Sequence, residues 1–374
     1  MVSQQPPMEK RAASPTGDNR QLIKPLTSIR FFAAMIVIMY HSGSGFINAS
    51  PHAPTALKSF LLNGYVGVPF FFVLSGFILH LTYRGRLTDR AKIGDFAVAR
   101  FARIYPVYLL SVVAMAPFVS PFQGWRDVPQ FFGLQWWITS PNPYSSMWNG
   151  PSWTVSVEIF FYFCFPALSA VAKRLGSRSI ILTISALLAV GLITGGPSFW
   201  CLRPANFEWL RWVPTPIVRL PEFAVGILVS ELHIRREGRR FPIPAWLPPA
   251  AALALMSASH EQWVGSAVTF LAALTVVAIA GSPETWLIRA LQHRWLVLMG
   301  AASYSLYLLH QFVHFSTVAL LGTSKATVLI QYPAVLILSV MVFLYFEEPT
   351  REWIRRRGRM KPSVMEQVAE PSEA

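Results

Sequence analysis

Ten long apolar runs constrain what this chain can fold into more than any other feature. The runs lie at about 27–47, 60–82, 98–119, 152–171, 179–195, 213–232, 243–259, 264–281, 295–321 and 327–346. Each run is continuous rather than alternating, which predicts helices and not the strands of a membrane barrel. A helix needs roughly 20 such residues to cross a bilayer. The sequence therefore predicts an all-α fold, a polytopic membrane helix bundle of about ten transmembrane helices.

Composition agrees with a membrane protein. Of the 374 residues, 53% are hydrophobic and only 13% are charged. A large soluble protein carries nearer a quarter of charged residues. The balance therefore favours a chain whose helices face lipid over one that faces water on all sides.

The positive charge of the chain is distributed unevenly. The formal net charge is +14, and 23 of the 32 Lys and Arg residues fall in one set of alternate connections and tails, against 5 in the other set. The positive-inside rule assigns the richer side to the cytoplasm, which predicts that both termini are cytoplasmic. The charge thus describes topology, and it does not indicate a nucleic-acid partner.

The two ends of the chain differ from its middle. Residues 1–25 are polar and rich in Pro and Ser, which predicts a disordered cytoplasmic tail. Residues 26–351 are expected to form the transmembrane domain. Residues 352–374 begin with basic residues and are expected to continue as a disordered cytoplasmic tail.

Arg30 and His41 are the two basic side chains of the first apolar run. An ionisable group inside a span is costly and is a functional-site hypothesis by default. Eleven residues at about 100° each place both on one helix face, roughly 16 Å apart along the axis. That reach is comparable to an extended pantetheine arm. One end could therefore hold a phosphate group while the other meets a reactive group.

Arg100 and Arg103 open the third run and share one helix face. Guanidinium groups bind phosphate oxygens as a fork and stay charged when partly desolvated. Together with Arg30, they indicate a polyanionic cytoplasmic ligand; anchoring by the positive-inside rule is the alternative. Glu158 lies inside the fourth run, where a carboxylate needs an arginine or a histidine as its partner.

Four further residues are candidates for supporting roles. Arg219 and Glu222 are spaced for an internal ion pair, for which a structural role is favoured. His310 lies in the middle of the ninth run, and a satisfied packing residue is the alternative there. Ser75 could be a nucleophile, but it lies in a stretch of small residues that permit close helix packing and has no nucleophile elbow around it.

Several common motifs are missing. The chain has no P-loop, no dinucleotide fingerprint, no G-x-S-x-G and no Cys/His set with metal-ligand spacing, so no metal is expected. Glu347 and Glu348 precede Pro349 at the end of the last run. For this acidic pair, a salt-bridged role at the helix end is favoured over chemistry.

Seven segments of the chain occur in the order found in the acyltransferase-3 family of integral-membrane O-acyltransferases. They read LTSIRFFAAMIVIMYH, GYVGVPFFFVLSGFIL, RFARIYPVYLL, SWTVSVEIFFYFCFP, RLPEFAVG, SYSLYLLHQ and FEEPTR. The chain resembles this family from about Leu26 to Arg351. Several ordered motifs carry the resemblance, whereas the Arg30–His41 spacing alone would not.

The resemblance implies an enzyme that transfers an acyl group, commonly acetyl, from cytoplasmic acyl-CoA to a hydroxyl. Acceptors in the family are cell-envelope, exopolysaccharide or lipid-linked glycans, and in some members sugar-bearing small molecules such as macrolides. Acyl-CoA, a glycan or glycolipid acceptor and membrane lipid are the implied partners. The implied location is the bacterial cytoplasmic (inner) membrane.

The resemblance also implies residue roles. By position, His41 matches the essential histidine of the family and Arg30 its paired arginine. Arg100 and Arg103 match the arginine pair, so that three arginines are expected to hold acyl-CoA. Glu158 matches the acidic residue of the serine–tryptophan motif. The expected catalytic residues are thus His41 and Glu158.

Two departures from the family pattern leave alternatives open. Many members carry an aspartate shortly before the first arginine, where this chain has Thr27 and Ser28. Many also append a periplasmic esterase-like domain, which this sequence lacks, so a separate extracytoplasmic partner protein could complete the transfer. A transporter or glycan-lipid flippase is the rival from another class, although no inverted repeat supports it. An inactive sensor or scaffold on the same fold is a second rival.

Overall fold

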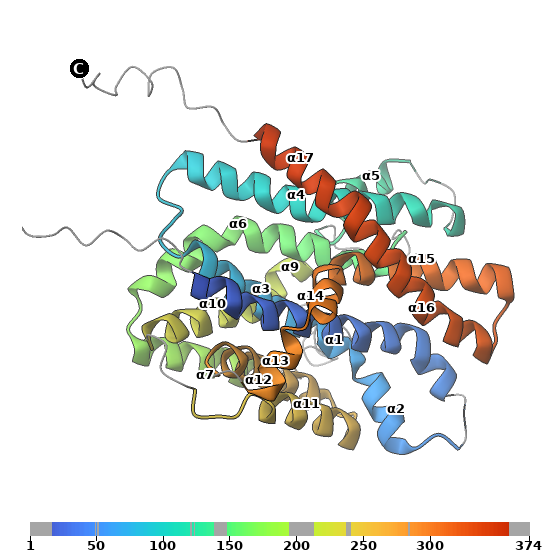
Figure 1. Ribbon diagram of the computed structural model, residues 1–374, viewed down its shortest axis with the longest axis horizontal. Helices are drawn as coiled ribbons and strands as arrows, with labels where there is room; N and C mark the ends of the chain where they lie inside the picture. The colour runs from blue at the N-terminus through green and yellow to red at the C-terminus, as the bar shows by residue number, and fades with distance from the viewer. Residues whose placement is uncertain are drawn as a thin grey trace, which may run out of the picture.

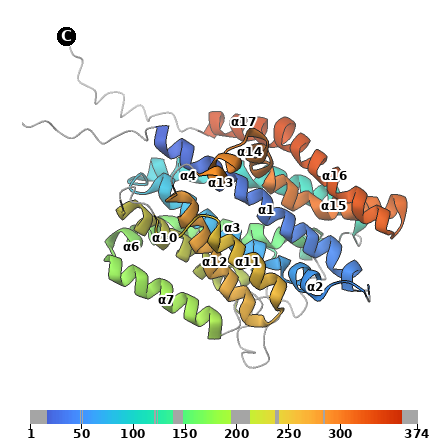
Figure 2. The ribbon, with the colours of Figure 1, turned by 60° about the horizontal axis from the view of Figure 1, so that its bottom comes forward.

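The computed structural model describes residues 17–48, 50, 52–119, 122, 124–137, 148–193, 213–236, 241–282 and 285–358. These residues form helices and their connections, with no strand among them. Figures 1 and 2 show the helices packed against one another in one bundle. The predicted all-α membrane bundle is confirmed.

The longer helices follow one another through the whole described chain. They are α1 (Gly17–Asn48), α2 (Thr55–Leu62), α3 (Gly67–Tyr83), α4 (Arg90–Met115), α6 (Trp153–Arg174), α7 (Ser177–Ile193), α10 (Leu220–Arg235), α11 (Leu247–Ala258), α12 (Gln262–Ala280), α13 (Trp286–Leu291), α14 (Arg294–Ala301), α15 (Ser303–Leu321), α16 (Lys325–Val342) and α17 (Glu348–Gly358). Two four-residue helices, α5 (Val128–Phe131) and α9 (Thr215–Val218), lie in connections. Short 3-10 turns cover Gly64–Val66, Ala116–Phe118, Gly124–Arg126 and Gly150–Ser152.

Six helical stretches in the described residues are long and apolar enough to cross a membrane. They are Lys24–Gly45, Thr55–Tyr83, Arg90–Phe118, Gly150–Arg174, Trp263–Ala280 and Lys325–Gly358. The pair α14 and α15 forms a seventh, bent by 62°, and shorter apolar helices cover Ser177–Val190 and Leu247–Ala258. The chain is therefore a multi-pass membrane protein, while the count of ten and the side of each terminus stay predictions.

Small residues set the closest helix crossings. A Cβ atom at Gly76 of α3 would collide with the Phe223 carbonyl of α10, and one at Gly226 of α10 would collide with the Val73 carbonyl of α3. A Cβ atom at Gly67 would lie 2.6 Å from the Ala33 carbonyl oxygen of α1. The packing role predicted for the small residues around Ser75 is thus confirmed, because only glycine lets these backbones meet.

The predicted run 295–321 is divided in the structure. Helices α14 and α15 meet at Ala302 with a bend of 62°. Gly300 on α14 lies against the Thr27 carbonyl of α1, and Ser28 donates a hydrogen bond to the Leu291 carbonyl. Helices α13 and α14 are therefore held on the first part of α1, while α15 turns to run alongside α16 (Figure 1).

The last helix also changes its winding. Residues Phe343–Glu347 form a π-helical turn between α16 and α17. Such turns insert one residue into a helix and are frequent at functional sites. Here the turn brings the side chain of Glu347 into the bundle, where it is buried.

The ends of the described chain are helical. Helix α1 begins at Gly17, inside the predicted tail 1–25, and α17 continues to Gly358, beyond the boundary predicted at 352. The remaining parts of the predicted tails, residues 1–16 and 359–374, lie outside the described residues. The domain boundaries stay predictions.

Candidate active site

A small cavity lies among α1, α3, α6 and α15. Its volume is about 30 Å³, room for about one water molecule. The lining residues are Arg30, Val68, Phe71, Phe72, Thr154, Glu158, Ser303, Tyr304 and Tyr307. The structure thus brings together Arg30 and Glu158, two of the predicted site residues, although they are far apart in the sequence.

Arg30 and Glu158 face this cavity without bonding to each other. The Arg30 guanidinium packs over the Phe71 ring, with 6.0 Å between its Cζ and the ring centroid. Within the described part of the chain, neither side chain makes a hydrogen bond or an ion pair. An unbonded charge in a protein interior is costly. The pair is therefore available to bind a ligand or water.

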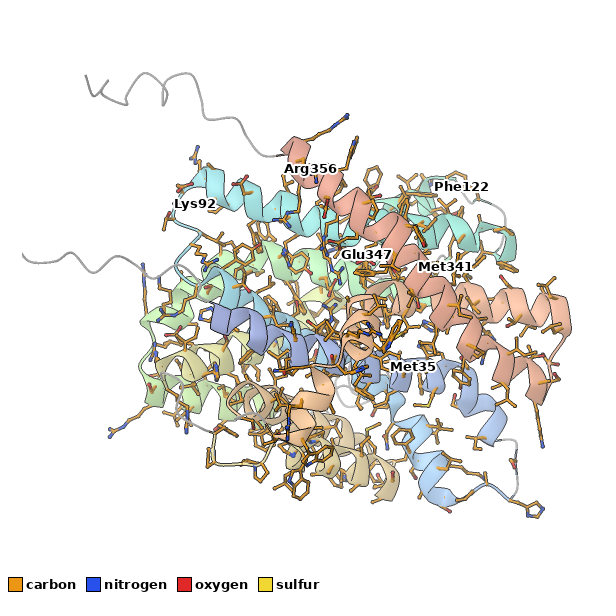
Figure 3. The ribbon with its side chains drawn as sticks, in the orientation of Figure 1. Met35, Lys92, Phe122, Met341, Glu347 and Arg356 are labelled. Atoms are coloured by element: carbon orange, nitrogen blue, oxygen red, sulfur yellow. The ribbon has the colours of Figure 1, made fainter. Side chains whose placement is uncertain are left out.

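Arg103 is paired with a carboxylate from another part of the chain. Its guanidinium forms an ion pair with Glu347, which lies where α16 passes into α17 (Figure 3). The second carboxylate oxygen of Glu347 accepts a hydrogen bond from Ser305 at 2.6 Å. Arg103 also packs over the Tyr304 ring, 5.8 Å from Cζ to the centroid. Tyr304 thus separates Arg103 from the cavity that Arg30 lines.

Glu347 has more contacts than its sequence context predicts. The predicted salt bridges are present, because Glu347 pairs with Arg103 and Glu348 pairs with Arg351. The prediction that the helix ends at this acidic pair is wrong, because the π-helical turn leads directly into α17, which continues to Gly358. The sequence did not show that Glu347 would point into the bundle, next to the predicted site. The π-helical turn that reorients it is not recognisable from the periodicity of the run.

Arg100 lies in an aromatic cage beside Arg103. Its Cζ lies 5.6 Å, 5.8 Å and 5.9 Å from the ring centroids of Tyr83, Phe96 and Tyr162. Its Nη2 donates to the Tyr83 hydroxyl at 3.4 Å, whereas its Nε is buried without a partner. Arg100 is therefore held by rings rather than by a carboxylate, which leaves its charge uncompensated by direct contact.

His41 contacts a second histidine. Its ring centroid lies 5.2 Å from that of His310 on α15 and 5.0 Å from that of Tyr40. His310 is buried, and its Nδ1 lies 2.6 Å from the Tyr307 carbonyl oxygen, to which it can only donate. Its Nε2 then carries the lone pair and has no partner in the described structure. The second histidine of the site is thus fixed in one tautomer beside the first.

Tyr307 joins the histidine pair to the cavity. Its side chain lines the cavity, and its carbonyl accepts the hydrogen bond from His310. His41 itself is exposed on α1 and does not line the cavity. Arg30 and His41 do lie on one unbroken helix, as the sequence predicts. The central cavity reaches Arg30 and not His41.

The other predicted supporting residues do not line the central cavity. Arg219 is almost fully buried, and its Nε lies 3.1 Å from the Glu222 carboxylate, so the predicted internal pair exists. Its guanidinium lies 5.3 Å from the Phe72 ring centroid and 5.5 Å from that of Trp153. Ser75 is half-buried on α3 and has no hydrogen bond among the described residues.

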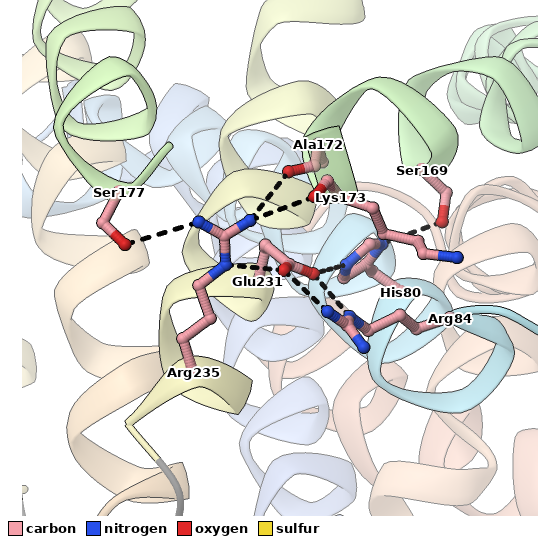
Figure 4. A network of polar contacts seen from close by, with 8 residues as sticks. All are labelled: His80, Arg84, Ser169, Ala172, Lys173, Ser177, Glu231 and Arg235. Atoms are coloured by element: carbon pink, nitrogen blue, oxygen red, sulfur yellow. Dashed lines mark hydrogen bonds and ion pairs between the residues drawn. The ribbon is translucent and has the colours of Figure 1, made fainter. Parts of the chain in front are cut away.

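A second buried charge cluster was not predicted. Glu231 on α10 is fully buried and lies within 2.9 Å of nitrogen atoms on His80, Arg84 and Arg235 (Figure 4). His80 bonds on its other side to Ser169 at 3.0 Å. The hydrogen bond to Glu231 raises the pKa of Arg84, which follows the end of α3. The signal for this cluster was the presence of His80 and Glu231 inside apolar runs.

No group of three or more His, Cys, Asp or Glu side chains suited to a metal ion occurs in the described residues. The site is instead made of arginines, one free carboxylate and two adjacent histidines inside a bundle of membrane helices. This arrangement is that of a membrane-embedded polar site with anion-binding and proton-accepting groups.

Comparison with known proteins identifies the class. The family model described as an acyltransferase domain (Acyl_transf_3) matches residues 25–348. The chain therefore belongs to the acyltransferase-3 family, and it is an acyltransferase. All of the predicted site residues lie inside the matched range.

Two relatives illustrate the similarity. The chain is 28% identical over 306 residues to the acyltransferase MdmB of Streptomyces mycarofaciens, covering 76% of this chain and 77% of that protein. It is 26% identical over 319 residues to the O-acetyltransferase OatA of Staphylococcus aureus, covering 76% of this chain. The alignment spans about half, 49%, of that O-acetyltransferase. No solved structure matches the chain.

Proposed function

We propose that this acyltransferase moves an acyl group, commonly acetyl, from cytoplasmic acyl-CoA to a hydroxyl of a glycan or glycolipid in a bacterial cytoplasmic membrane. The observation that carries the proposal is the unbonded pair Arg30 and Glu158 at one cavity, next to the histidine pair. The similarity to an O-acetyltransferase supports a hydroxyl acceptor. Membrane lipid surrounds the enzyme, and a separate extracytoplasmic protein could receive the acyl group.

The arginines are suited to hold the donor. Arg100, with its charge facing rings rather than a carboxylate, would bind phosphate oxygens of CoA. Arg103 is already paired with Glu347, so it would bind phosphate only as a member of a network. Arg30 lies deeper, at the cavity, and would guide the arm that carries the thioester.

His41 can act in two ways. As a general base it would take the proton of the acceptor hydroxyl while that oxygen attacks the thioester carbonyl, and the departing CoA thiolate would then receive the proton. As a nucleophile it would displace the thiolate and carry the acyl group on its ring until the hydroxyl attacks, again with the proton passing to the thiolate. Either way, the C–S bond breaks and a C–O ester bond forms.

Two neighbours would assist His41. The lone pair on Nε2 of His310 faces no protein partner, so it would accept a proton from the acceptor or from His41. Glu158 would balance the positive charge that develops on His41 without touching it, because Glu158 lines the central cavity and His41 does not.

The direct test uses radiolabelled acetyl-CoA and membranes that contain a glycan acceptor. We expect His41→Ala to lower label transfer at least about 100-fold, the contribution of a catalytic base. The matched control is His52→Ala, an exposed histidine outside the helices, which should keep the wild-type rate. Equal transfer by His41→Ala and wild type would remove His41 from the mechanism. Absence of CoA release from both would favour a transporter or an inactive scaffold.

A second test separates the donor-binding role from topology. Arg100→Ala should raise KM for acetyl-CoA about tenfold, because one charged contact to phosphate is lost. Insertion and melting temperature should stay close to those of the wild type. An unchanged KM would assign Arg100 to membrane anchoring.

The acceptor requires a separate experiment. Analysis of the cell-envelope glycans of a deletion strain should show the loss of one ester-linked acyl group, which returns with the wild-type gene and not with His41→Ala. An intact glycan ester pattern, with loss of an acylated small molecule instead, would redirect the proposal to a sugar-bearing small-molecule acceptor.

A further inference from the structure

A large open cavity lies at one end of the bundle, away from the central one. It occupies about 550 Å³ between the connection from α3 to α4, the first turns of α4 and the end of α17. Helix α17 runs beside α4, and Gly358 at its end packs on Val98. Figure 3 shows Lys92 and Arg356 at this same end of the molecule. The volume is within the range of small-molecule sites.

The walls of this cavity carry an excess of positive charge. Arg86, Lys92 and Arg355 line it, against the single carboxylate of Asp95. Lys92 is held by Asp89 at 3.0 Å. The side chains of Arg86 and Arg355 make no ion pair or hydrogen bond with another described residue. One arginine from the α3–α4 connection and one from α17 are thus available to bind one anion.

The inner wall is aromatic and leads toward the predicted site. Tyr83 and Phe96 line the cavity, and the same two rings pack on Arg100. Arg100, with its unpartnered buried Nε, therefore lies directly behind the aromatic wall. Phosphates placed at the mouth and a planar ring placed on the wall would both find matching groups.

Helix α4 lines this cavity and carries two further arginines beyond it. Arg103 lies about 4.5 Å further along α4 than Arg100, one turn deeper in the bundle. It packs on Tyr304, which itself lines the cavity that contains Arg30. The basic residues thus form a series that runs from the large cavity through Arg100 and Arg103 to Arg30.

We propose that the large cavity binds the phosphate-bearing nucleotide of the acyl donor, with Arg86 and Arg355 as phosphate ligands and Tyr83 and Phe96 beside the base. This inference rests on the proposed function, because it assigns an acyl-CoA donor. The nucleotide then stays at the predicted cytoplasmic surface, while the arm that carries the thioester follows the arginine series inward. An anionic phospholipid headgroup shares the phosphate chemistry and is the competing occupant.

The probe for this site is adenosine 3′,5′-bisphosphate, the nucleotide part of CoA without the thioester arm. Its binding is measured by calorimetry on the full chain in nanodiscs of phosphatidylcholine alone, and again with phosphatidylglycerol added. Arg86→Gln and Arg355→Gln should each weaken binding about tenfold, as expected for the loss of one charged contact. The matched control is Arg356→Gln, which removes the same charge from the next residue of α17, where it pairs with Glu352. Its affinity should stay within about twofold of the wild type.

A kinetic experiment tests this inference separately from the proposed function. Arg86→Gln and Arg355→Gln should raise KM for acetyl-CoA about tenfold, yet transfer acetyl from S-acetylpantetheine, which lacks the nucleotide, at the wild-type rate. Melting temperature and elution profile of each variant confirm that it is folded.

Each outcome supports or contradicts either the nucleotide site or the proposed acyl transfer. Equal nucleotide affinity in wild type, Arg86→Gln and Arg355→Gln overturns the site, even where acetyl transfer proceeds. Loss of affinity in Arg356→Gln to the same extent also overturns it, because general surface charge would then explain the effect. Tighter retention of phosphatidylglycerol by the wild type than by the two variants, with no nucleotide binding, assigns the cavity to lipid. Nucleotide binding that depends on Arg86 and Arg355, without acyl transfer by the wild type, supports the site and contradicts the proposed function.

Discussion

Two groups of charges among the helices of this molecule differ in how completely they are paired. Around Glu231, one carboxylate receives hydrogen bonds from Arg84, Arg235 and His80. At the central cavity, Arg30 and Glu158 face one space and bond to neither each other nor another described side chain. A saturated cluster has no capacity left for a ligand, whereas an unsaturated one gains free energy when a ligand supplies the missing partners.

The two groups also differ in what they connect. The Glu231 cluster ties the ends of α3, α6 and α10 together, since its hydrogen bonds reach Ser169 and the carbonyls of Ala172 and Lys173. The central cavity lies where α1, α3, α6 and α15 converge. We infer that the first group serves the stability of the bundle and the second serves its chemistry.

The largest expected effect is on folding, from Glu231→Ala. This change leaves three basic side chains without their carboxylate, and breaking a buried ion pair costs about 3 kcal/mol or more. The free energy of unfolding, measured by denaturant titration in detergent, should fall by that amount. Acyl transfer per folded molecule should stay near the wild-type rate. Lost activity with an unchanged free energy of unfolding would contradict the structural role of Glu231 and place it in the active site.

Glu158→Gln is the opposite case. The substitution keeps the shape of the side chain and removes its charge, so transfer should slow by about 10- to 100-fold, within the usual contribution of a catalytic charge. Since Glu158 holds no helix partner, the free energy of unfolding should change by less than about 1 kcal/mol. Initial rates and a melting curve on the same preparation check both. A full rate, or a large loss of stability, would show that the central carboxylate is structural.

Arg219→Lys should have an effect on stability between those of Glu231→Ala and Glu158→Gln. The guanidinium of Arg219 packs beside the rings of Phe72 and Trp153 and pairs with Glu222. Lysine keeps the charge but loses the flat stacking surface, so we expect a loss of about 1 kcal/mol in the free energy of unfolding. The measured rate should follow the folded fraction. A fall in kcat at unchanged stability would make Arg219 part of the site.

Glu352→Gln should have the smallest effect. Glu352 pairs with Arg356 on the exposed face of α17, at 3.2 Å. Exposed pairs of this kind contribute less than about 0.5 kcal/mol. The free energy of unfolding should therefore match that of the wild type within this limit. A loss comparable to that of Glu231→Ala would show that burial does not distinguish the two carboxylates.

The sequence alone determined the class of fold and the contents of the first helix. Continuous apolar runs admit only helices in a bilayer, and eleven residues of helix fix Arg30 and His41 on one face. The Arg219–Glu222 pair and the glycine contacts were equally predictable, because they depend on spacing within a helix or on side-chain size. Local geometry is enough for such features.

Only the tertiary structure decided which charges meet. His80 and Glu231 are 151 positions apart, and Arg103 and Glu347 are 244 apart, so no periodicity in the sequence links them. The bend at Ala302 and the π-helical turn before α17 direct Tyr307, His310 and Glu347 toward partners on other helices. A charged residue in an apolar run indicates that it needs a partner. The packing of helices that are distant in the sequence determines which residue that partner is.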